Sequence, residues 1–319
     1  MKSKIIIGIE TSCDDTCVGV IEIIEKKTSN IKNIINNKVN ILANIKINQN
    51  TLHSPYGGVV PEVAARGHIG RLPSIFKETL MNINLKIEDV DLIAYTCKPG
   101  LLGSLLIGEN FAKGLSCRNN IPLIGVNHLE AHNLVSLMNN LYITFPFLGL
   151  IISGGHTELW LFKNLNEYEI LESTKDDAIG ELFDKVGREM GLEFPAGGKI
   201  EILSDGVIEK DGNLNISLPK VFSFSGLKTK FIRMLQEGKI DKKIIAYNLQ
   251  LVVSKILINL LKKYNKNYYI VVGGGVASNK YIRSELMKNF NNIYFPSIDL
   301  CTDNGVMIAW TGYLNSLNN

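Results

Sequence analysis

Several features that would set this chain apart from ordinary globular proteins are missing from its sequence. Its 5 cysteines form no Cys-x-x-Cys pair and are odd in number, so we expect reduced thiols and no disulfide framework. The formal net charge of +3 is too small to indicate nucleic-acid binding by itself. The longest strongly apolar runs, such as Phe147 to Ile152, fall far short of the roughly 20 residues that cross a bilayer.

These absences predict a cytoplasmic protein without a membrane-spanning helix. The first apolar run, Ile5 to Ile9, passes directly into Glu10 and a polar loop. It is too short for the apolar core of a signal peptide, and the segment is too acidic for a transit peptide.

Signatures of common enzyme classes are also absent. No Gly-rich loop ends in Gly-Lys-Ser/Thr or opens as Gly-x-Gly-x-x-Gly, so any nucleotide would be held by a different architecture. The segment His128 to His132 reads His-Leu-Glu-Ala-His, whereas a zinc protease has His-Glu-x-x-His. Because Leu129 occupies the place of the protease's acid, a metallopeptidase is disfavoured.

The pattern of predicted strands indicates two similar halves. A chain of 319 residues with 45% apolar and 20% charged residues suits two lobes. Each half begins as strand, polar turn and strand, and later has a strand followed by a Gly-rich loop and a helix. The strands are predicted at Ile5 to Ile9, Cys17 to Ile24 and Asp91 to Thr96, then at Phe147 to Ile152, Glu158 to Phe162 and Tyr269 to Val272. This repeat predicts duplicated α/β lobes facing a cleft, although such units occur in any α/β protein.

A long helix is predicted from Glu62 to Asn82, after a Gly/Pro turn. Its polar positions include Arg66, His68 and Arg71. They could meet an anionic partner, but a solvated basic face is the commoner role. The Lys/Asn/Ile-rich stretch from Glu25 to Asn50 is predicted to form strands with a variable turn, and we assign it no chemistry.

The most informative stretch runs from Gly125 to His132 and contains two histidines. If it is helical, His128 and His132 lie on one face about 5–6 Å apart at Cβ, close enough to bind one divalent metal. A pair of imidazoles without a metal is the alternative. Asp303 precedes a predicted C-terminal helix and suits either an N-cap or a third metal ligand. Two histidines and one carboxylate suit Fe(II) or Zn(II).

Gly-rich loops let backbone N–H groups approach phosphate oxygens closely. Three such loops occur in the second half, at Ser153 to Thr157, Ala196 to Gly198 and Gly273 to Gly275. Each alone is usually a plain turn, but three together favour a nucleotide site. Asp184 and Glu201 could accept hydrogen bonds from ribose hydroxyls, or pair with basic residues on the surface.

Together these motifs resemble one family, the tRNA threonylcarbamoyltransferase subunits called TsaD or Gcp. The resemblance runs in order from Ile5 to Gly312. Its opening motif, Gly8 to Asp15, is similar to the family's GIETSCDE. The other matching segments are Tyr56 to His68 (YGGVVPExASRxH), Asn127 to His132 (HHMEGH), Ile151 to Thr157 (VSGGHT), Gly180 to Lys185 (GEAFDK), Phe222 to Thr229, Gly274 to Asn279 and Cys301 to Ala309.

The resemblance implies an α/β fold of two duplicated lobes of the actin-like, sugar kinase and Hsp70 (ASKHA) type around a central cleft. We divide the chain into an N-terminal lobe, residues 1–125, and a C-terminal lobe, residues 126–319. The metal-ligand helix would lie at the junction, and the final helix could return to the N-terminal lobe. The implied reaction transfers threonylcarbamoyl from threonylcarbamoyl-AMP to N6 of adenosine 37 in tRNAs that read codons starting with A.

The resemblance also implies site residues. His128, His132 and Asp303 would bind one metal, usually Fe(II), with Zn(II) as the alternative. The adenylate would be bound by Ile151, Ile152, Ser153, Gly154, Gly155, Asp184, Gly197, Glu201 and Asn279. No catalytic residue is assigned, and the candidates for a general base are Glu10, Asp14 and Asp15.

Partners follow from the family. Bacterial relatives work with a paralogue of the same fold and a small ATPase, whereas mitochondrial relatives act as homodimers. The tRNA would meet basic residues near the cleft, with a solvated face as the alternative for each. The residues considered are Arg66, Lys228, Lys230 and Arg233.

Three departures from the family's pattern stand out. Lys98 replaces a glycine, Asp15 replaces a glutamate, and Lys199 follows the Ala-Gly-Gly loop, where it could alter nucleotide binding. Two other functions remain as alternatives, a sugar or metabolite kinase of the same fold and a noncatalytic nucleotide-binding scaffold. A kinase needs an acidic base and Mg-ATP but no histidine pair, and an intact ligand set argues against a scaffold.

Overall fold

The computed structural model describes residues 2–25, 37–140, 142–208 and 212–317. The chain forms two compact units, Met1–Phe145 with Asp303–Asn319, and Pro146–Thr302. These units differ from the expected boundary at residue 125, because the helix that carries His128 packs within the first unit. The C-terminal helix also belongs to the first unit.

The first unit contains a five-stranded sheet in the order β3-β2-β1-β4-β5. Neighbouring strands are antiparallel from β1 to β3 and parallel from β1 through β4 to β5. The strands are β1 (Lys2–Glu10), β2 (Thr16–Glu25), β3 (Lys38–Ile47), β4 (Leu92–Lys98) and β5 (Leu123–Asn127). The turn predicted between β2 and β3 falls largely within residues 26–36, outside the described part of the chain.

The second unit repeats this topology. Its sheet has the order β10-β9-β6-β7-β8, with β6 to β8 antiparallel and β6, β9 and β10 parallel. The strands are β6 (Phe147–Ile152), β7 (Thr157–Asn164), β8 (Glu167–Ser173), β9 (Tyr269–Gly273) and β10 (Ile293–Tyr294). Each strand of one sheet has a counterpart with the same directions in the other, so the predicted duplication is confirmed.

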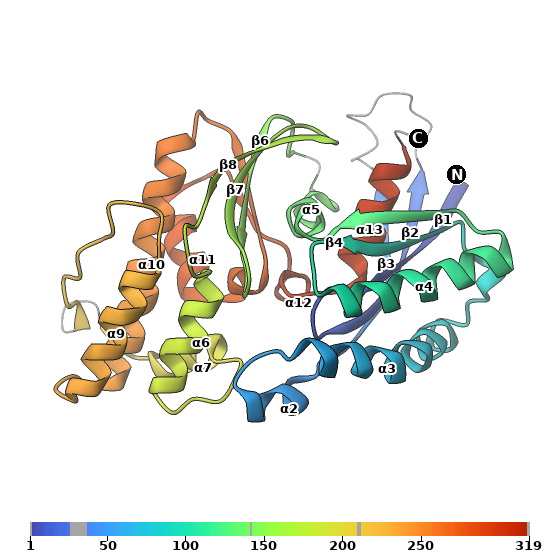
Figure 1. The fold of residues 1–319 in the computed structure, drawn as a ribbon. Coiled ribbons are helices and arrows are strands. Elements are labelled where there is room, and N and C mark those ends of the chain that lie inside the picture. The colour runs from blue at the N-terminus through green and yellow to red at the C-terminus, as the bar shows by residue number, and fades with distance from the viewer. Residues whose placement is uncertain (1, 26–36, 141, 209–211, 318–319) are drawn as a thin grey trace. The chain divides into compact units, whose positions relative to one another are not determined.

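Helices cover both faces of the first sheet. On one face, Ile7 and Ile9 of β1 pack with Leu72 of α3 in one core cluster. On the other face, Gly8 lies directly against α13. The two long helices α3 and α4 run side by side in the lower part of this unit (Figure 1). The helical elements are α2 (Asn50–His53), η1 (Ser54–Tyr56), α3 (Pro61–Asn82), η2 (Ile87–Asp89), α4 (Leu102–Asn119), α5 (His128–Leu134), η3 (Val135–Leu137) and α13 (Gly305–Ser316).

The close approach of α13 to β1 requires glycine at position 8. A Cβ built on Gly8 would lie 2.0 Å from the carbonyl oxygen of Gly305, a backbone atom that cannot move aside alone. We expect Gly8→Ala to lower the free energy of unfolding by about 1–3 kcal/mol or more, because overpacking must displace the helix. Urea denaturation measures this loss. Gly70→Ala is the control, since Gly70 is an exposed residue of α3 with open space at its Cβ; equal stability of the two variants would contradict this packing.

The second unit has its main core on one face of its sheet. Leu148 and Leu150 of β6 pack there with residues of α6, α9, α10 and α11. On the opposite face, Phe147, Trp160 and Phe162 stack on one another. The helical elements are α6 (Ile179–Glu189), α7 (Gly197–Leu203), α9 (Ser225–Glu237), α10 (Lys242–Tyr264), η4 (Gly275–Ser278), α11 (Lys280–Asn289) and α12 (Ile298–Cys301).

Helix α10 is long and apolar enough to cross a membrane, a property that the shorter apolar runs did not suggest. It is interrupted by polar residues in sequence, so it does not read as one apolar run. In the structure, 83% of its most apolar window is buried inside the protein. This burial is typical of a core helix, and α10 is the central helix of the second unit's core.

Candidate functional site

The two histidines lie on one short helix, as their spacing predicts. Strand β5 ends at Asn127, whose side chain caps α5 by accepting hydrogen bonds from the backbone N–H groups of Leu129 and Glu130. This cap begins the helix at His128. The rings of His128 and His132 then face the same side, with centroids 4.7 Å apart and an edge-to-face angle of 83°.

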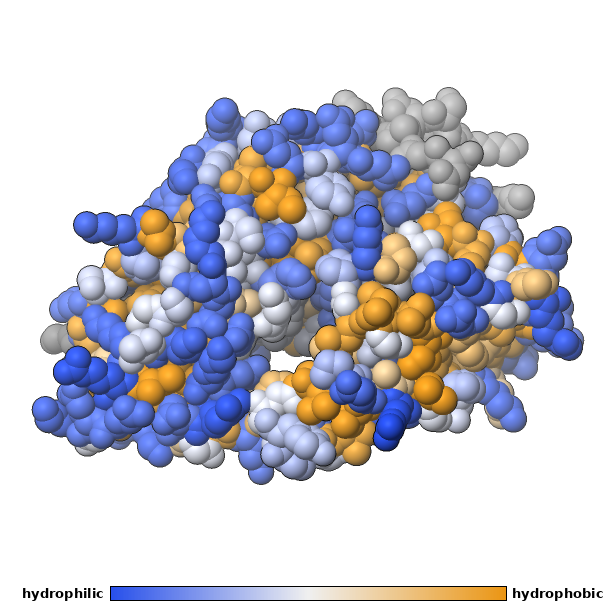
Figure 2. Space-filling view, in the orientation of Figure 1, coloured by the Kyte–Doolittle hydropathy of each residue, from blue (hydrophilic) through white to orange (hydrophobic). Residues whose placement is uncertain are grey.

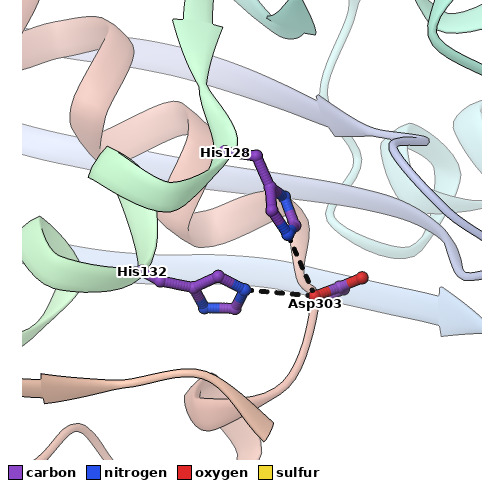
Figure 3. A group of neighbouring side chains, drawn as sticks. All are labelled: His128, His132 and Asp303. Carbon is purple, nitrogen blue, oxygen red and sulfur yellow. Dashed lines mark hydrogen bonds and ion pairs between the residues drawn. The ribbon is translucent and has the colours of Figure 1, made fainter. Parts of the chain in front are cut away.

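Asp303 directs its carboxylate at both histidines (Figure 3). Its Oδ1 lies 3.2 Å from Nε2 of His132 and 3.6 Å from Nε2 of His128. The alternative role of Asp303 as the N-cap of the C-terminal helix is wrong, because Asn304 caps α13 by accepting a hydrogen bond from the Met307 N–H. The Asp303 carboxylate is therefore not used by the helix and is directed at the histidines.

This arrangement fits one metal ion. The three ligand atoms all lie within 4.8 Å of one another. Two ligands that each lie about 2.1 Å from one ion are separated by about 3–3.5 Å at tetrahedral or octahedral angles. The distances from Asp303 Oδ1 to the two Nε2 atoms, 3.2 Å and 3.6 Å, are close to that value. In addition, Nδ1 of His132 is buried with no hydrogen-bond partner among the described residues, so the ring is not held in place by an alternative structural bond there.

Glu10, at the end of β1, holds His128 from the opposite side. Its Oε2 lies 2.9 Å from Nδ1 of His128, and the carboxylate is fully buried. It also accepts hydrogen bonds from the Thr96 hydroxyl and the Ser12 N–H. A carboxylate on Nδ1 makes that nitrogen the proton donor and leaves Nε2, which faces Asp303, free to coordinate. The geometry therefore makes Glu10 a partner of His128 and disfavours it as a base for substrate.

The charges of the site are strongly coupled. Burial opposes the charged form of His128, but the Glu10 and Asp303 carboxylates outweigh it and raise the pKa of His128 to about 9. Burial also opposes ionisation of Asp303, yet His128 and His132 hold its pKa well below the usual range. The pKa of His132 is lowered, chiefly by burial. Without a metal, His128 is therefore the histidine that carries the positive charge near neutral pH, and His132 stays neutral.

His68 is buried, so its predicted place on a solvated basic face is wrong. From α3 it clamps the turn between β1 and β2, with Nε2 2.9 Å from the Cys13 carbonyl oxygen and Nδ1 2.7 Å from the Thr16 hydroxyl. A carbonyl can only accept, so Nε2 carries the proton. At the end of this turn, Asp15 is paired with Lys46. Burial and the Asp303 charge raise the pKa of Asp15 to about 7.

The clamp predicts a pH dependence of stability. Burial lowers the pKa of His68, so the folded protein prefers the neutral ring. The stability from this preference is present above the unfolded pKa of about 6.5 and is lost as the pH falls through the lower folded pKa. We expect the stability advantage of the wild type over His68→Gln to shrink between pH 7.5 and pH 5, as measured by urea unfolding. An advantage that stays constant with pH would contradict the neutral clamp.

A second candidate site is a pocket within the second unit. Five of the predicted adenylate residues line it, namely Gly154, Asp184, Gly197, Glu201 and Asn279. The other four are not among its lining residues: Ile151 and Ile152 are fully buried in β6, and Ser153 and Gly155 lie beside the pocket in the same loop. The described residues that line it without having been predicted are Gly180, Phe183, Pro195, Gly198, Gly275, Val276, Ser278 and Thr302.

The polar side chains of this pocket are already partly engaged. Asp184 accepts a hydrogen bond from the Ala196 N–H at 2.7 Å, and burial raises its pKa. Glu201 accepts one from the Lys280 N–H at 2.9 Å. Asn279 caps α11. Lys199 binds the backbone and carboxylate of Glu193, so this departure from the family's pattern does not place a cation among the lining residues.

The basic residues considered for tRNA differ in their surroundings. Lys228 is half-buried and forms an ion pair of 2.6 Å with Asp177. Arg233 pairs with Glu237 on the same helix. Arg66 and Lys230 are exposed. The main role of Lys228 is therefore structural, because a tRNA phosphate would have to compete with Asp177 for its ammonium group.

Known proteins resemble this chain over nearly its whole length. The family model described as TsaD, tRNA N6-adenosine threonylcarbamoyltransferase, matches residues 40–310. Relatives with that name include one from Borreliella burgdorferi, 42% identical over 97% of this chain and 88% of the relative. Another, from Thermosipho africanus, is 40% identical over 97% of this chain and 93% of the relative.

Solved structures of low sequence identity share the fold. HypF from T. kodakarensis superimposes with a TM-score of 0.63 at 13% identity, over 99% of this chain and 48% of that protein. Component A of the Acidaminococcus fermentans (R)-2-hydroxyglutaryl-CoA dehydratase gives 0.58 at 14% identity, over 99% and 97%. These likenesses confirm the ASKHA fold predicted for the two lobes. The family model and the relatives of about 40% identity extend over most of the chain, so the chain belongs to the tRNA N6-adenosine threonylcarbamoyltransferase family.

Proposed function

We propose that this chain transfers a threonylcarbamoyl group from threonylcarbamoyl-AMP to N6 of adenosine 37 in tRNAs that read codons starting with A, and releases AMP. The observation that carries the proposal is the family match over residues 40–310, a range that includes His128, His132 and Asp303. Membership makes the chain a tRNA-modifying transferase. The donor and the acceptor position are our inference.

The chemistry of this transfer sets what the site must do. The adenine N6 amine attacks the carbamoyl carbon, a C–N bond forms, the C–O bond to phosphate breaks, and AMP leaves with that electron pair. One proton leaves the amine. Because this amine is a weak nucleophile, positioning of the donor and stabilisation of negative charge should supply most of the rate enhancement.

In this proposal His128, His132 and Asp303 hold one divalent ion, Fe(II) by resemblance and Zn(II) as the alternative. When bound, such an ion supplies a Lewis acid and a template for anionic oxygens. The protein's own contribution is to fix the ligands. Glu10 orients His128 through Nδ1, and the α5 cap at Asn127 fixes the helix that carries both rings.

The pocket of the second unit would hold the nucleotide part of the donor. Gly154 and Gly197 have no side chain, so backbone N–H groups can approach phosphate closely. Asp184 accepts the Ala196 N–H with Oδ1 and Glu201 accepts the Lys280 N–H with Oε1, and the second oxygen of each carboxylate would accept from the ribose hydroxyls. Contacts from Ile151 and Ile152 would come through the backbone at the end of β6, and contacts from Ser153 and Gly155 through the loop that follows. Asn279 would shape the adenine side rather than bind it with its amide, since that amide caps α11.

We propose Asp14 or Asp15, in the turn after β1, as the general base. Asp15, with a pKa of about 7, can be ionised or protonated near neutral pH, which suits a group that accepts a proton. Its ion pair with Lys46 would have to open or rearrange for that role.

Partner binding is proposed on the outer face of α3 and α4. Ile69, Leu102 and Leu106 are exposed there, and Figure 2 shows apolar side chains gathered over these helices. A contiguous exposed apolar patch marks a protein interface. We propose a same-fold paralogue with a small ATPase, or a second copy of this chain, as the occupant, in the cytoplasm where tRNA is modified.

The test is transfer from synthetic threonylcarbamoyl-AMP to an unmodified tRNA transcript, with an A37→G transcript as the control. We expect N6-threonylcarbamoyladenosine in the first transcript and none in the second. Transfer by the chain alone would support the homodimer, and transfer only with the paralogue and ATPase would support the multiprotein form. Modification at another adenosine, or none with any partner, would overturn the proposal.

A further inference from the structure

A buried glutamine lies beneath the pocket of the second unit. Gln250 is on α10, is fully buried, and is not among the described residues that line the pocket. Its Oε1 accepts a hydrogen bond of 2.7 Å from Nδ2 of Asn279. Its Nε2 donates one of 2.6 Å to the hydroxyl of Ser204. Both polar atoms of the Gln250 amide are therefore hydrogen-bonded, one to Asn279, which lines the pocket, and one to Ser204, which follows a helix that lines it.

The two partners belong to different walls of the pocket. Asn279 lies at the start of α11, directly after η4, which supplies Gly275, Val276 and Ser278 to one wall. Ser204 follows α7, which supplies Gly197, Gly198 and Glu201 to the other. The Ser204 hydroxyl continues the chain of bonds by donating to the Glu201 carbonyl oxygen at 2.8 Å. Gln250 thus joins the two walls through the helix behind them.

The donor and acceptor of every hydrogen bond in this network, from Asn279 through Gln250 and Ser204 to the Glu201 carbonyl, follow from the groups at its two ends. The Ile282 N–H donates to Oδ1 of Asn279, so the other atom of that amide must be the donor toward Gln250. At the far end, the Glu201 carbonyl can only accept, so the Ser204 hydroxyl gives its proton there and accepts from Gln250. The uncharged amide of Gln250 offers the required acceptor and donor together.

We propose that Gln250 is a positioning residue for nucleotide binding, which sets the separation of the α7 and η4 walls without touching the ligand. This inference rests on the proposed function, which assigns the pocket to the adenylate. A buried network of this kind is rigid when all its members are satisfied, and removal of one member leaves buried polar groups without partners. Loss of the amide should therefore let the walls shift and weaken binding.

The experiment measures AMP affinity by titration calorimetry on the full-length protein. We expect Gln250→Met to bind AMP about 5–20-fold more weakly than wild type, because at least one buried hydrogen bond is lost and the pocket is no longer pre-formed. Metal binding by the first unit should be unchanged. In transfer assays the KM for threonylcarbamoyl-AMP should rise with little change in kcat, as expected when ground-state and transition-state binding fall together.

Ser254→Ala is the matched control. Ser254 is also buried in α10, its hydroxyl donates to the Gln250 carbonyl oxygen inside the helix, and it is not among the described residues that line the pocket. It should bind AMP as wild type does. A milder second variant, Ser204→Ala, should weaken AMP binding in the same direction, and the double variant with Gln250→Met should lose less than the sum, because both act through one network.

The outcomes distinguish the positioning role of Gln250 from the proposed function. If wild type binds AMP and Gln250→Met and Ser204→Ala bind it equally well, the positioning role is overturned and the proposed function stands. If Gln250→Met does not fold, the Ser204→Ala result decides alone. If wild type itself does not bind AMP, the assignment of the pocket fails and the inference fails with it.

Discussion

Replacement of His132 by alanine should abolish metal binding and transfer while leaving the fold intact. The ring supplies the shortest contact to Asp303, at 3.2 Å, and only His128 and Asp303 remain after its removal. Two ligands hold a divalent ion far more weakly than three, so we expect the affinity to fall by at least about 100-fold. Elemental analysis of the purified variant and the rate of transfer to tRNA measure the two losses.

The matched control is Asn133→Ala. Asn133 is the next residue of α5 and is equally buried, but its side chain donates to the Leu129 carbonyl oxygen within the helix and does not face Asp303. This variant should keep its metal and its activity even if it loses some stability. A His132→Ala protein that transfers threonylcarbamoyl at the wild-type rate without a bound metal would show that the three residues are not the metal site.

The second large effect is expected from Glu10→Gln. This change removes the negative charge behind His128 and replaces an obligate acceptor with an amide of either orientation. Nδ1 of His128 would no longer be held as the donor, so Nε2 would be available to the metal only part of the time. Loss of such an outer carboxylate typically costs 10–100-fold in metal affinity, and we expect a loss in that range.

Two measurements check this expectation independently of activity. Competition with a chromophoric chelator gives the affinity for Zn(II), and NMR titration of the metal-free protein gives the pKa of His128, which should fall from about 9 when the Glu10 charge is removed. Glu25→Gln serves as the control, because Glu25 pairs with Lys4 at the other end of the same hairpin. Unchanged affinity and an unchanged His128 pKa in Glu10→Gln would mean that Glu10 does not orient the ring.

The sequence predicts the fold well because its pattern is local. Apolar runs at Ile5 to Ile9 and Phe147 to Ile152 are each followed by a small polar turn, so strand positions and the repeat of the two halves follow from the pattern. The C-terminal helix is harder, because α13 joins the first unit through a close approach of Gly305 to Gly8, nearly 300 positions away. In the sequence, the only hint of this contact is that β1 and α13 each carry a glycine, Gly8 and Gly305.

For the site, spacing identifies the ligands but not their supports. His128 and His132 follow from the i,i+4 rule, whereas the pairing of His128 with Glu10 joins residues 118 positions apart. His68 shows the opposite error. A polar residue on a long helix is usually solvated, yet here tertiary packing buries it against the Cys13 carbonyl oxygen. The role of Gln250 could not be predicted either, because its partners Ser204 and Asn279 lie far from it in sequence and the pattern of α10 indicates only an apolar helix.

The measurement that tests the central claim most directly is transfer by metal-stripped protein as Fe(II) or Zn(II) is restored. We expect stripped wild type to be inactive, and we expect activity to return in proportion to the metal bound and to saturate at one ion per chain. Asp303→Asn should need far more metal for the same recovery. Full transfer by the stripped protein, at a rate that added metal does not change, would contradict the account.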